Sequence, residues 1–195
     1  MRNVIAISLA ILLSSPIVAF AQQTGRGSTS VTAQDPGARV DALFSELKRA
    51  GNERAAQRVS ARILQEFNKS GSATVDLLMQ WSKEAMDAEK NDVALDFLDQ
   101  VVVLAPDYAE GWNRRATLHF TMNDYAKSMA DIARTLQLEP RHFGALGGMA
   151  TILKNAGRKE AAMHAYERVL EVYPMMREAQ TELGTIADEL AGQGI

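Results

Sequence analysis

"LQLEPRHFGAL", residues 136–146, places Pro140 between two apolar stretches, and the same layout occurs twice more in the chain. "VVLAPDYAEGW" (102–112) and "LEVYPMMREAQ" (170–180) also carry proline at their fifth position. Pro106, Pro140 and Pro174 are therefore separated by two equal intervals of 34 residues. Because proline ends one helix or opens the next, this spacing predicts a helical unit that repeats every 34 residues.

The prolines divide the chain into three units, 75–108, 109–142 and 143–176, each with its proline at unit position 32. Apolar or small residues tend to recur at unit positions 4, 7, 8 and 11, which is the spacing of one helix face. Positions 20, 21, 24, 27 and 28 mark a second face. Turn residues such as Asn, Asp and Gly separate the two faces in every unit. Each unit is thus predicted to be a helical hairpin.

These residues resemble the tetratricopeptide repeat family, whose pattern is W-x2-L-G-x2-Y, then A-x3-F, then P. The matching positions are Trp112, Ala116, Ala94-x3-Leu98, Ala162-x3-Tyr166 and the three prolines. The resemblance implies an all-α fold, a right-handed α-solenoid of stacked helical hairpins. It also implies core positions for Trp81 and Trp112.

Two residues of the middle unit depart from the family pattern. Arg115 and His119 place polar groups where the family has apolar or aromatic side chains. We expect Arg115 to lay its stem over the core between units and to keep its charged head in water.

The flanks extend the repeats in both directions. "AGNERAAQRVSARILQEF" (50–67) parallels "AGRKEAAMHAYERVLEVY" (156–173), so residues 38–74 are predicted to be a degenerate N-terminal repeat of the same stack. Four extra residues are expected in or near "NKSGSAT" (68–74). Residues 177–191 match a first helix with no second helix after it, which predicts a capping helix over the C-terminal end.

The N-terminal residues are typical of an export signal. An apolar run from residue 4 follows Arg2, and small residues in an A-x-A arrangement precede Gln22. This predicts a signal peptide over residues 1–21, cleaved between Ala21 and Gln22, and a protein exported to the periplasm. The alternative is an inner-membrane anchor formed by the uncleaved signal. Residues 22–37 are polar and rich in Gly, Ser and Thr, which predicts a flexible linker.

Charge and composition restrict the partners. Removing residues 1–21, which carry one arginine and no acidic group, moves the formal net charge from −3 to −4. The chain has no block of like charges, which argues against nucleic-acid binding and against stable membrane association after cleavage. It has no cysteine, which excludes disulfides and thiolate chemistry.

The family resemblance also implies a binding surface. In the family, unit positions 2, 5, 9, 12 and 13 of the first helices face a concave groove. The residues predicted to form a partner-binding groove are Lys83, Met86, Asn113, Thr117, Phe120, Gly144, Gly147, Thr151, Lys154 and Asn155. Such a groove suits an extended or helical peptide; the alternative is an ordinary solvated helix face. The glycines of "GALGGMA" (144–150) fall inside a predicted helix, where either close packing or an open groove floor explains them.

No pattern of catalytic or metal-binding residues stands out. His119, His142 and His164 form no HExxH motif and no i, i+4 pair, so no metal site is predicted. No serine belongs to a recognisable nucleophile framework, so no catalytic residue and no cofactor are predicted.

The sequence therefore predicts a non-enzymatic protein–protein interaction scaffold of the bacterial periplasm. Its layout resembles small exported proteobacterial repeat proteins associated with cell-envelope integrity. The alternative is an accessory subunit that regulates a peptidoglycan or other envelope enzyme. The sequence specifies a protein or peptide as the partner, but neither its identity nor the oligomeric state of the chain.

Overall fold

The computed structural model describes residues 35–192, which lie in one compact unit and form nine α-helices with no strand. The predicted signal peptide, its cleavage site at Ala21 and Gln22, and most of the predicted linker lie outside the described residues.

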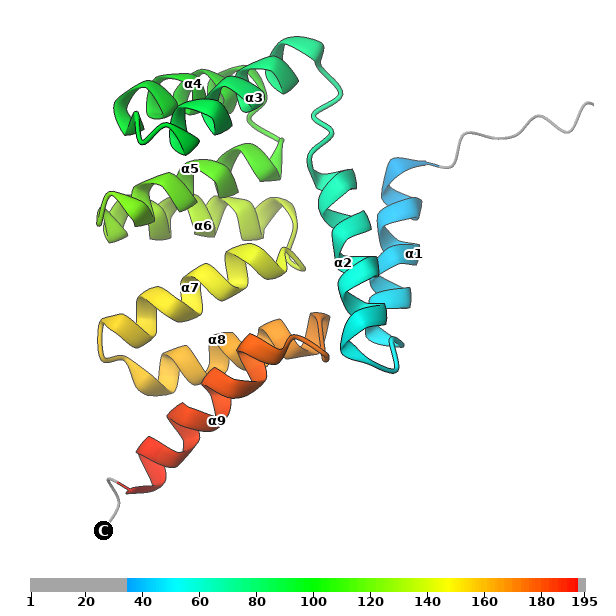
Figure 1. The fold of residues 1–195 in the computed structure, drawn as a ribbon, viewed down its shortest axis with the longest axis vertical. Coiled ribbons are helices and arrows are strands. Elements are labelled where there is room, and N and C mark those ends of the chain that lie inside the picture. Colours follow the sequence, from blue (N-terminus) through cyan, green and yellow to red (C-terminus); the bar gives the residue numbers. More distant parts are fainter. Residues whose placement is uncertain (1–34, 193–195) are drawn as a thin grey trace, which may run out of the picture. The chain divides into compact units, whose positions relative to one another are not determined.

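The helices after the first two form a continuous stack (Figure 1). They are α3 (Ala73–Asp87), α4 (Asn91–Leu104), α5 (Ala109–Thr121), α6 (Tyr125–Leu138), α7 (Phe143–Asn155), α8 (Lys159–Val172) and α9 (Arg177–Gly192). Each of these helices packs on the next, so three hairpins follow one another and α9 covers α8. This arrangement confirms the predicted all-α solenoid with a C-terminal capping helix. We refer to the three hairpins as the first, second and third repeats.

The turn inside each repeat has the same backbone conformation. Glu89, Asn123 and Gly157 lie 34 residues apart, and all three adopt the left-handed region, with φ of 57°, 61° and 71°. Glycine and asparagine tolerate this region, whereas a glutamate there is strained by its Cβ. The recurring turn shows that the 34-residue period extends to single backbone positions.

The proline seams between repeats differ in how their carbonyl groups are bonded. Trp112 Nε1 donates to the Pro106 carbonyl at 3.0 Å, and Gln180 Nε2 donates to the Pro174 carbonyl at 2.7 Å. Both donors occupy position 4 of their unit. The third repeat has Leu146 there, which has no side-chain donor. At that seam His142 instead caps α7, because its Nδ1 accepts from the Ala145 N–H at 3.1 Å.

Interdigitated apolar side chains hold neighbouring repeats together. Leu118 of α5 belongs to the core cluster of α3 and α4 and is fully buried. At the next junction Ala145 and Ile152 of α7 pack with Ala116 and Ile132. Burying a leucine or isoleucine side chain contributes about 1.5–3 kcal/mol, so a few such residues stabilise each junction.

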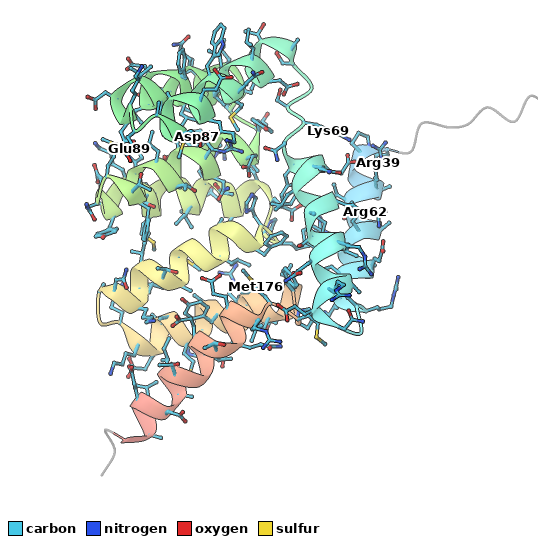
Figure 2. All side chains as sticks on the ribbon, in the orientation of Figure 1. Arg39, Arg62, Lys69, Asp87, Glu89 and Met176 are labelled. Atoms are coloured by element: carbon cyan, nitrogen blue, oxygen red, sulfur yellow. The ribbon has the colours of Figure 1, made fainter. Side chains whose placement is uncertain are left out.

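The first two helices, α1 (Pro36–Lys48) and α2 (Glu53–Phe67), form a hairpin of their own. α1 begins inside the stretch predicted as linker, because proline suits the first helical turn and Asp35 accepts from the Gly37 N–H at 3.3 Å. Arg39, Arg62 and Lys69 lie along this hairpin (Figure 2), where each pairs with a glutamate.

The hairpin does not stack on α3, which differs from the expectation of a first repeat in line with the others. Its core residues pack on Phe143 at the start of α7 and on Tyr173 at the end of α8. The Phe67 ring stacks on His142, with ring centroids 4.8 Å apart. The physical cause is the connection over 68–72, which has no proline and turns at Gly71 with φ of 78°. α3 also begins two residues before the predicted unit.

This placement changes the environment of Trp81. The side chain was expected in the core, but it is 42% exposed because no preceding hairpin covers that side of α3. Trp112 is only partly buried, and the Arg115 guanidinium lies 4.9 Å from the centre of its ring.

Candidate peptide-binding groove

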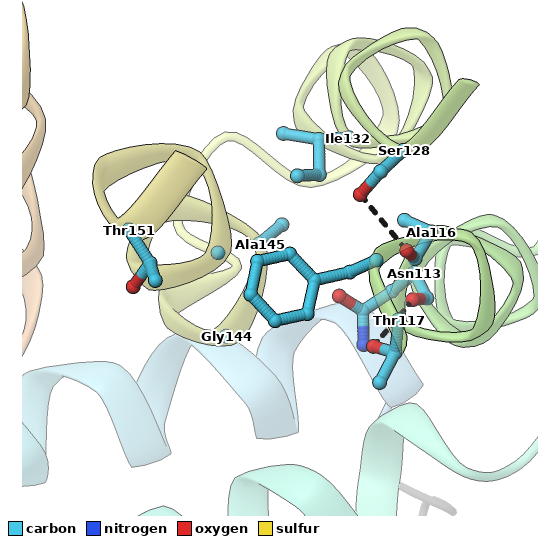
Figure 3. Close-up of a pocket in the computed structure, with 10 residues that line it drawn as sticks. Asn113, Ala116, Thr117, Ser128, Ile132, Gly144, Ala145 and Thr151 are labelled. Atoms are coloured by element: carbon cyan, nitrogen blue, oxygen red, sulfur yellow. Dashed lines mark hydrogen bonds between the residues drawn. The ribbon is translucent and has the colours of Figure 1, made fainter. Parts of the chain in front are cut away.

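Two hollows flank α7. The first, of about 160 Å³, lies between α5, α6 and α7 (Figure 3), and the second, of about 190 Å³, lies between α7, α8 and α9. Gly144, Gly148 and Thr151 of α7 line both of them. We call the two hollows together the α7 groove.

Glycines create the α7 groove. A Cβ atom at Gly147 would have no neighbour within 4 Å, and one at Gly148 would meet only Ile132 Cδ1 at 3.5 Å. Both positions could therefore carry a Cβ atom without a clash, and glycine leaves that space empty. Glycine inside a helix costs about 0.5–1 kcal/mol relative to alanine, so the open space comes with a loss of stability.

The walls combine apolar surface with hydrogen-bond acceptors. Phe120, Ile132 and Ala116 supply the apolar part of the first hollow. Thr117 Oγ1 donates to the Asn113 carbonyl at 3.0 Å, and Asn113 Nδ2 donates to Glu110 Oε2 at 3.1 Å. These bonds use the Thr117 hydroxyl proton and one of the two Asn113 N–H groups, and they leave the Asn113 amide oxygen and the threonine lone pairs as acceptors for a ligand that donates.

The structure brings together six of the ten predicted groove residues. Asn113, Thr117, Phe120, Gly144 and Thr151 line the first hollow, and Gly147 joins Gly144 and Thr151 in the second. They meet because they recur at fixed unit positions on successive first helices. Their role in binding stays a prediction.

The other four predicted residues, Lys83, Met86, Lys154 and Asn155, line neither hollow. Lys83 forms an ion pair with Asp87 one turn along its own helix, and Lys154 pairs with Glu182 of α9. The hydrogen bond to Glu182 raises the pKa of Lys154. Both lysine charges are therefore compensated within the chain.

Comparison with known proteins agrees with this geometry. A family model described as tetratricopeptide repeat matches residues 144–174. A TPR repeat-containing protein of Rhizobium etli is 52% identical over 157 residues, which cover 80% of this chain and 77% of that protein. This chain belongs to the tetratricopeptide repeat family. Repeats of this family typically mediate protein–protein interaction, and solenoids bind partners on extended concave surfaces.

Solved structures share the fold. One is described as the first TPR of Spaghetti (RPAP3) bound to the HSP90 peptide SRMEEVD; it has a TM-score of 0.58 and 25% sequence identity, and the match covers 62% of this chain and 95% of that chain. The crystal structure of MamA protein has a TM-score of 0.55 and 19% identity over 78% of this chain and 81% of that chain. The second similarity concerns the fold alone.

A buried cluster beside the first hollow escaped the sequence prediction. Glu110 is 6% exposed and accepts from Arg114 at 3.0 Å and from Asn113 at 3.1 Å. His142 Nε2 lies 3.0 Å from Glu110 Oε2. Because Nδ1 of His142 accepts from the Ala145 N–H, we assign the neutral tautomer in which Nε2 donates to Glu110.

The charge of Glu110 is stabilised by these donors. Burial alone would raise the pKa of Glu110, but the hydrogen bonds from His142 and Arg114 and the positive charge of Arg114 outweigh it and lower the pKa. The carboxylate thereby links the start of α5 to the start of α7 and orients the Asn113 amide in the groove. The sequence shows an acidic residue at unit position 2 and a histidine at unit position 34. The 34-residue repeat does not predict that these two side chains contact each other.

The second repeat of this tetratricopeptide array also contains a charged junction. Arg115 donates to both carboxylate oxygens of Asp131 at 2.8 and 2.7 Å and to Asp99 at 2.8 Å. The Arg115 side chain is only 18% exposed, so the expectation that its head lies in water is wrong. The hydrogen bonds that Arg115 donates to the Asp131 carboxylate raise the pKa of Arg115. Buried His119 lies beside the same carboxylate at 3.8 Å.

Over residues 35–192, no group of three or more His, Cys, Asp or Glu side chains is arranged to hold a metal ion. None of the helices in that range is both long enough and apolar enough to cross a membrane.

Proposed function

We propose that this tetratricopeptide repeat chain is a non-enzymatic interaction scaffold of the bacterial periplasm and that it binds a peptide segment of its partner in the α7 groove. The observation that carries the proposal is the pair of hollows beside the glycines of α7. Open space that costs helix stability is typical of sites where a ligand approaches the backbone closely.

The lining favours a particular kind of ligand. An apolar side chain of the partner would enter the first hollow against Phe120 and Ile132, while its backbone N–H groups would donate to Asn113 and the threonines. The peptide-bound structure of the RPAP3 repeat domain supports a peptide ligand for this fold. Its acidic peptide is not part of the proposal, because Lys83 and Lys154 are already paired.

A groove-filling experiment tests the site. Gly148→Leu and Gly147→Leu would each place a leucine side chain into one hollow, and Gly184→Leu would add the same side chain on α9, where a Cβ meets nothing within 4 Å. Tagged chains are crosslinked in cells and the co-purifying proteins are quantified by mass spectrometry. We expect recovery of the partner to fall at least about tenfold, equivalent to about 1.4 kcal/mol of binding, for the groove variants only.

Circular dichroism of each variant shows whether it remains folded. Undiminished recovery of the same partner by both folded groove variants would exclude the α7 groove as the binding site. Recovery of one stoichiometric envelope enzyme would favour a regulatory subunit over a general scaffold.

The proposed location rests on the apolar run and the A-x-A arrangement before Gln22. Cell fractionation followed by N-terminal sequencing is the direct test. We expect the periplasmic fraction to contain a chain that begins at Gln22. A chain that keeps residues 1–21 and sediments with the inner membrane would support the anchored alternative. We also propose a role in envelope integrity, because the layout resembles that of small exported repeat proteins associated with it, and we expect deletion of the gene to sensitise the cells to detergent.

A further inference from the structure

We propose that the open end of the repeat stack, formed by α3 and α4, pairs with the same surface of a second copy of this chain. The surface consists of Leu77, Trp81, Val93 and Phe97, which we call the end face. This proposal is independent of ligand binding in the α7 groove, because no residue of the end face lines that groove.

An internal comparison identifies the end face as a stacking surface without a neighbour. Unit position 3 holds Leu77 in the first repeat, Gly111 in the second and Ala145 in the third. Gly111 and Ala145 are buried against the preceding repeat, whereas Leu77 is 42% exposed. Unit position 3 therefore carries its largest apolar side chain, Leu77, in the repeat where no preceding hairpin covers this position.

Position 23 repeats the pattern. It holds Phe97, then Asp131, then Ala165, and the last two are buried while Phe97 is only partly buried. The first repeat thus exposes an aromatic ring at a position that its successors enclose. Since α1 and α2 pack on Phe143 and Tyr173, the hairpin of this chain leaves the position open.

The composition of the end face is that of an interface core. The rings of Trp81 and Phe97 pack together with centroids 5.6 Å apart, and they line an open hollow of about 400 Å³ together with Val93. Tryptophan anchors of this kind dominate the affinity of protein interfaces. Apolar side chains gathered on a single face mark an interaction site more than scattered ones do.

The rim of the hollow carries one charge of each sign, Glu84 and Lys90. Glu84 accepts from Gln80 at 2.9 Å, and no carboxylate pairs with Lys90 among residues 35–192. In a two-fold pair, when a residue of one copy contacts a different residue of the second copy, the same contact also forms in the reverse direction. Glu84 of one copy and Lys90 of the other can therefore form two equivalent ion pairs beside the apolar residues, which makes the end face complementary to a second copy of itself.

Other surfaces of the described chain fit the end face less well. The opposite end of the stack is covered by α9, whose exposed residues include Gln180, Thr181, Thr185 and Asp188. A polar surface does not complement an apolar one, so a head-to-tail contact is disfavoured. Residues 22–34, QQTGRGSTSVTAQ, are polar in composition as well. A second copy of the end face, by contrast, presents apolar side chains to the apolar side chains of the first.

Analytical ultracentrifugation of the full mature chain tests the pairing. We expect the mass to double between low and high micromolar concentration, and Trp81→Lys to weaken dimerisation at least about tenfold. Leu64→Lys is the matched control, since Leu64 is 38% exposed on α2 away from the end face and should leave the dimer intact. A chain that stays monomeric throughout, or a dimer that Trp81→Lys leaves unchanged, would overturn the proposal.

Two further measurements guard against a variant that fails to fold. Glu84→Lys and Lys90→Glu should each weaken the dimer, and the double variant should restore it if the two charges face each other across the axis. Because the chain has no cysteine, Val93→Cys provides a single site for a short bismaleimide crosslinker. We expect a crosslinked dimer from Val93→Cys and none from Leu64→Cys; the reverse result would place the contact on another surface.

Discussion

The second and third repeats occupy the same 34-residue register and fill it with opposite chemistry. Positions 7, 11 and 23 hold Arg115, His119 and Asp131 in the second repeat, and Met149, Leu153 and Ala165 in the third. The second repeat therefore encloses a bidentate ion pair, while the third has apolar packing and small residues beside two hollows.

This difference shows what the repeat frame does and does not determine. The frame fixes where each Cβ lies relative to the neighbouring helices. The side chain placed there decides whether the position holds a junction rigidly or leaves room for a ligand. Substitutions of the charged residues in the second repeat and of the glycines in both repeats test this comparison directly.

The largest effect is expected from removing the central carboxylate of the second repeat. Asp131→Ala leaves the largely buried Arg115 side chain with only Asp99 as an acidic partner, and removing one member of a buried pair costs about 3–5 kcal/mol. We expect the free energy of unfolding to fall by about 3 kcal/mol in urea titrations. Asp99→Ala is the control, because the Asp99 carboxylate is 55% exposed and should contribute less than about 1 kcal/mol. Equal losses in the two variants would contradict a buried, charge-dependent junction.

The second prediction concerns acid. Glu110 has a lowered pKa, so its charge stabilises the fold above the unfolded-state pKa of about 4.3, and this contribution disappears as the pH falls through the folded value. Glu110→Gln should cost about 2 kcal/mol at neutral pH, because charged hydrogen bonds are lost, and should weaken the decline of stability below the unfolded pKa.

The third repeat offers a matched pair for this test. Glu167 faces His164 at 2.9 Å on α8, but both side chains are exposed. Glu167→Gln should change the free energy of unfolding by less than about 0.5 kcal/mol, because an exposed pair contributes little. Thermal unfolding followed at several pH values measures both variants. If the two variants lose the same free energy of unfolding, burial does not explain the contribution of the Glu110–His142 contact to stability.

A smaller loss is expected at the junction between the first and second repeats. An alanine Cβ at Gly111 would lie 2.7 Å from Val101 Cγ1, closer than side chains tolerate. Overpacking costs about 1–3 kcal/mol, and the higher helix propensity of alanine returns about 1 kcal/mol. We therefore expect Gly111→Ala to lower the free energy of unfolding by about 1 kcal/mol. An unchanged urea midpoint would show that α4 and α5 can separate freely.

The features that follow the period could be predicted from the sequence. Equally spaced prolines and recurring helix faces specify the three hairpins and the capping helix, because each position depends only on its own helix and its neighbour. The six predicted residues in the α7 groove meet for the same reason, since successive first helices present equivalent positions on one surface.

Features that depend on contacts outside the period could not be predicted. Glu110 and His142 lie 32 residues apart, and Arg115 and Asp131 lie 16 apart, so each pair forms only once the helices are stacked. The docking of α1 and α2 depends on one glycine turn and on the complementarity of Phe67 to His142. Neither leaves a periodic signal, and the exposure of Trp81 follows from that docking.

The smallest expected effect is a gain in the free energy of unfolding rather than a loss. It distinguishes the third repeat from the second most clearly. Gly147→Ala makes the same substitution as Gly111→Ala inside a helix, but the new Cβ meets nothing within 4 Å. The gain in helix propensity is then unopposed, and we expect the free energy of unfolding to rise by about 0.5–1 kcal/mol in urea titrations. A loss of stability would mean that the second hollow is closed in solution. A gain would show that the glycine is kept at the expense of stability, which is the behaviour of a position that serves a ligand.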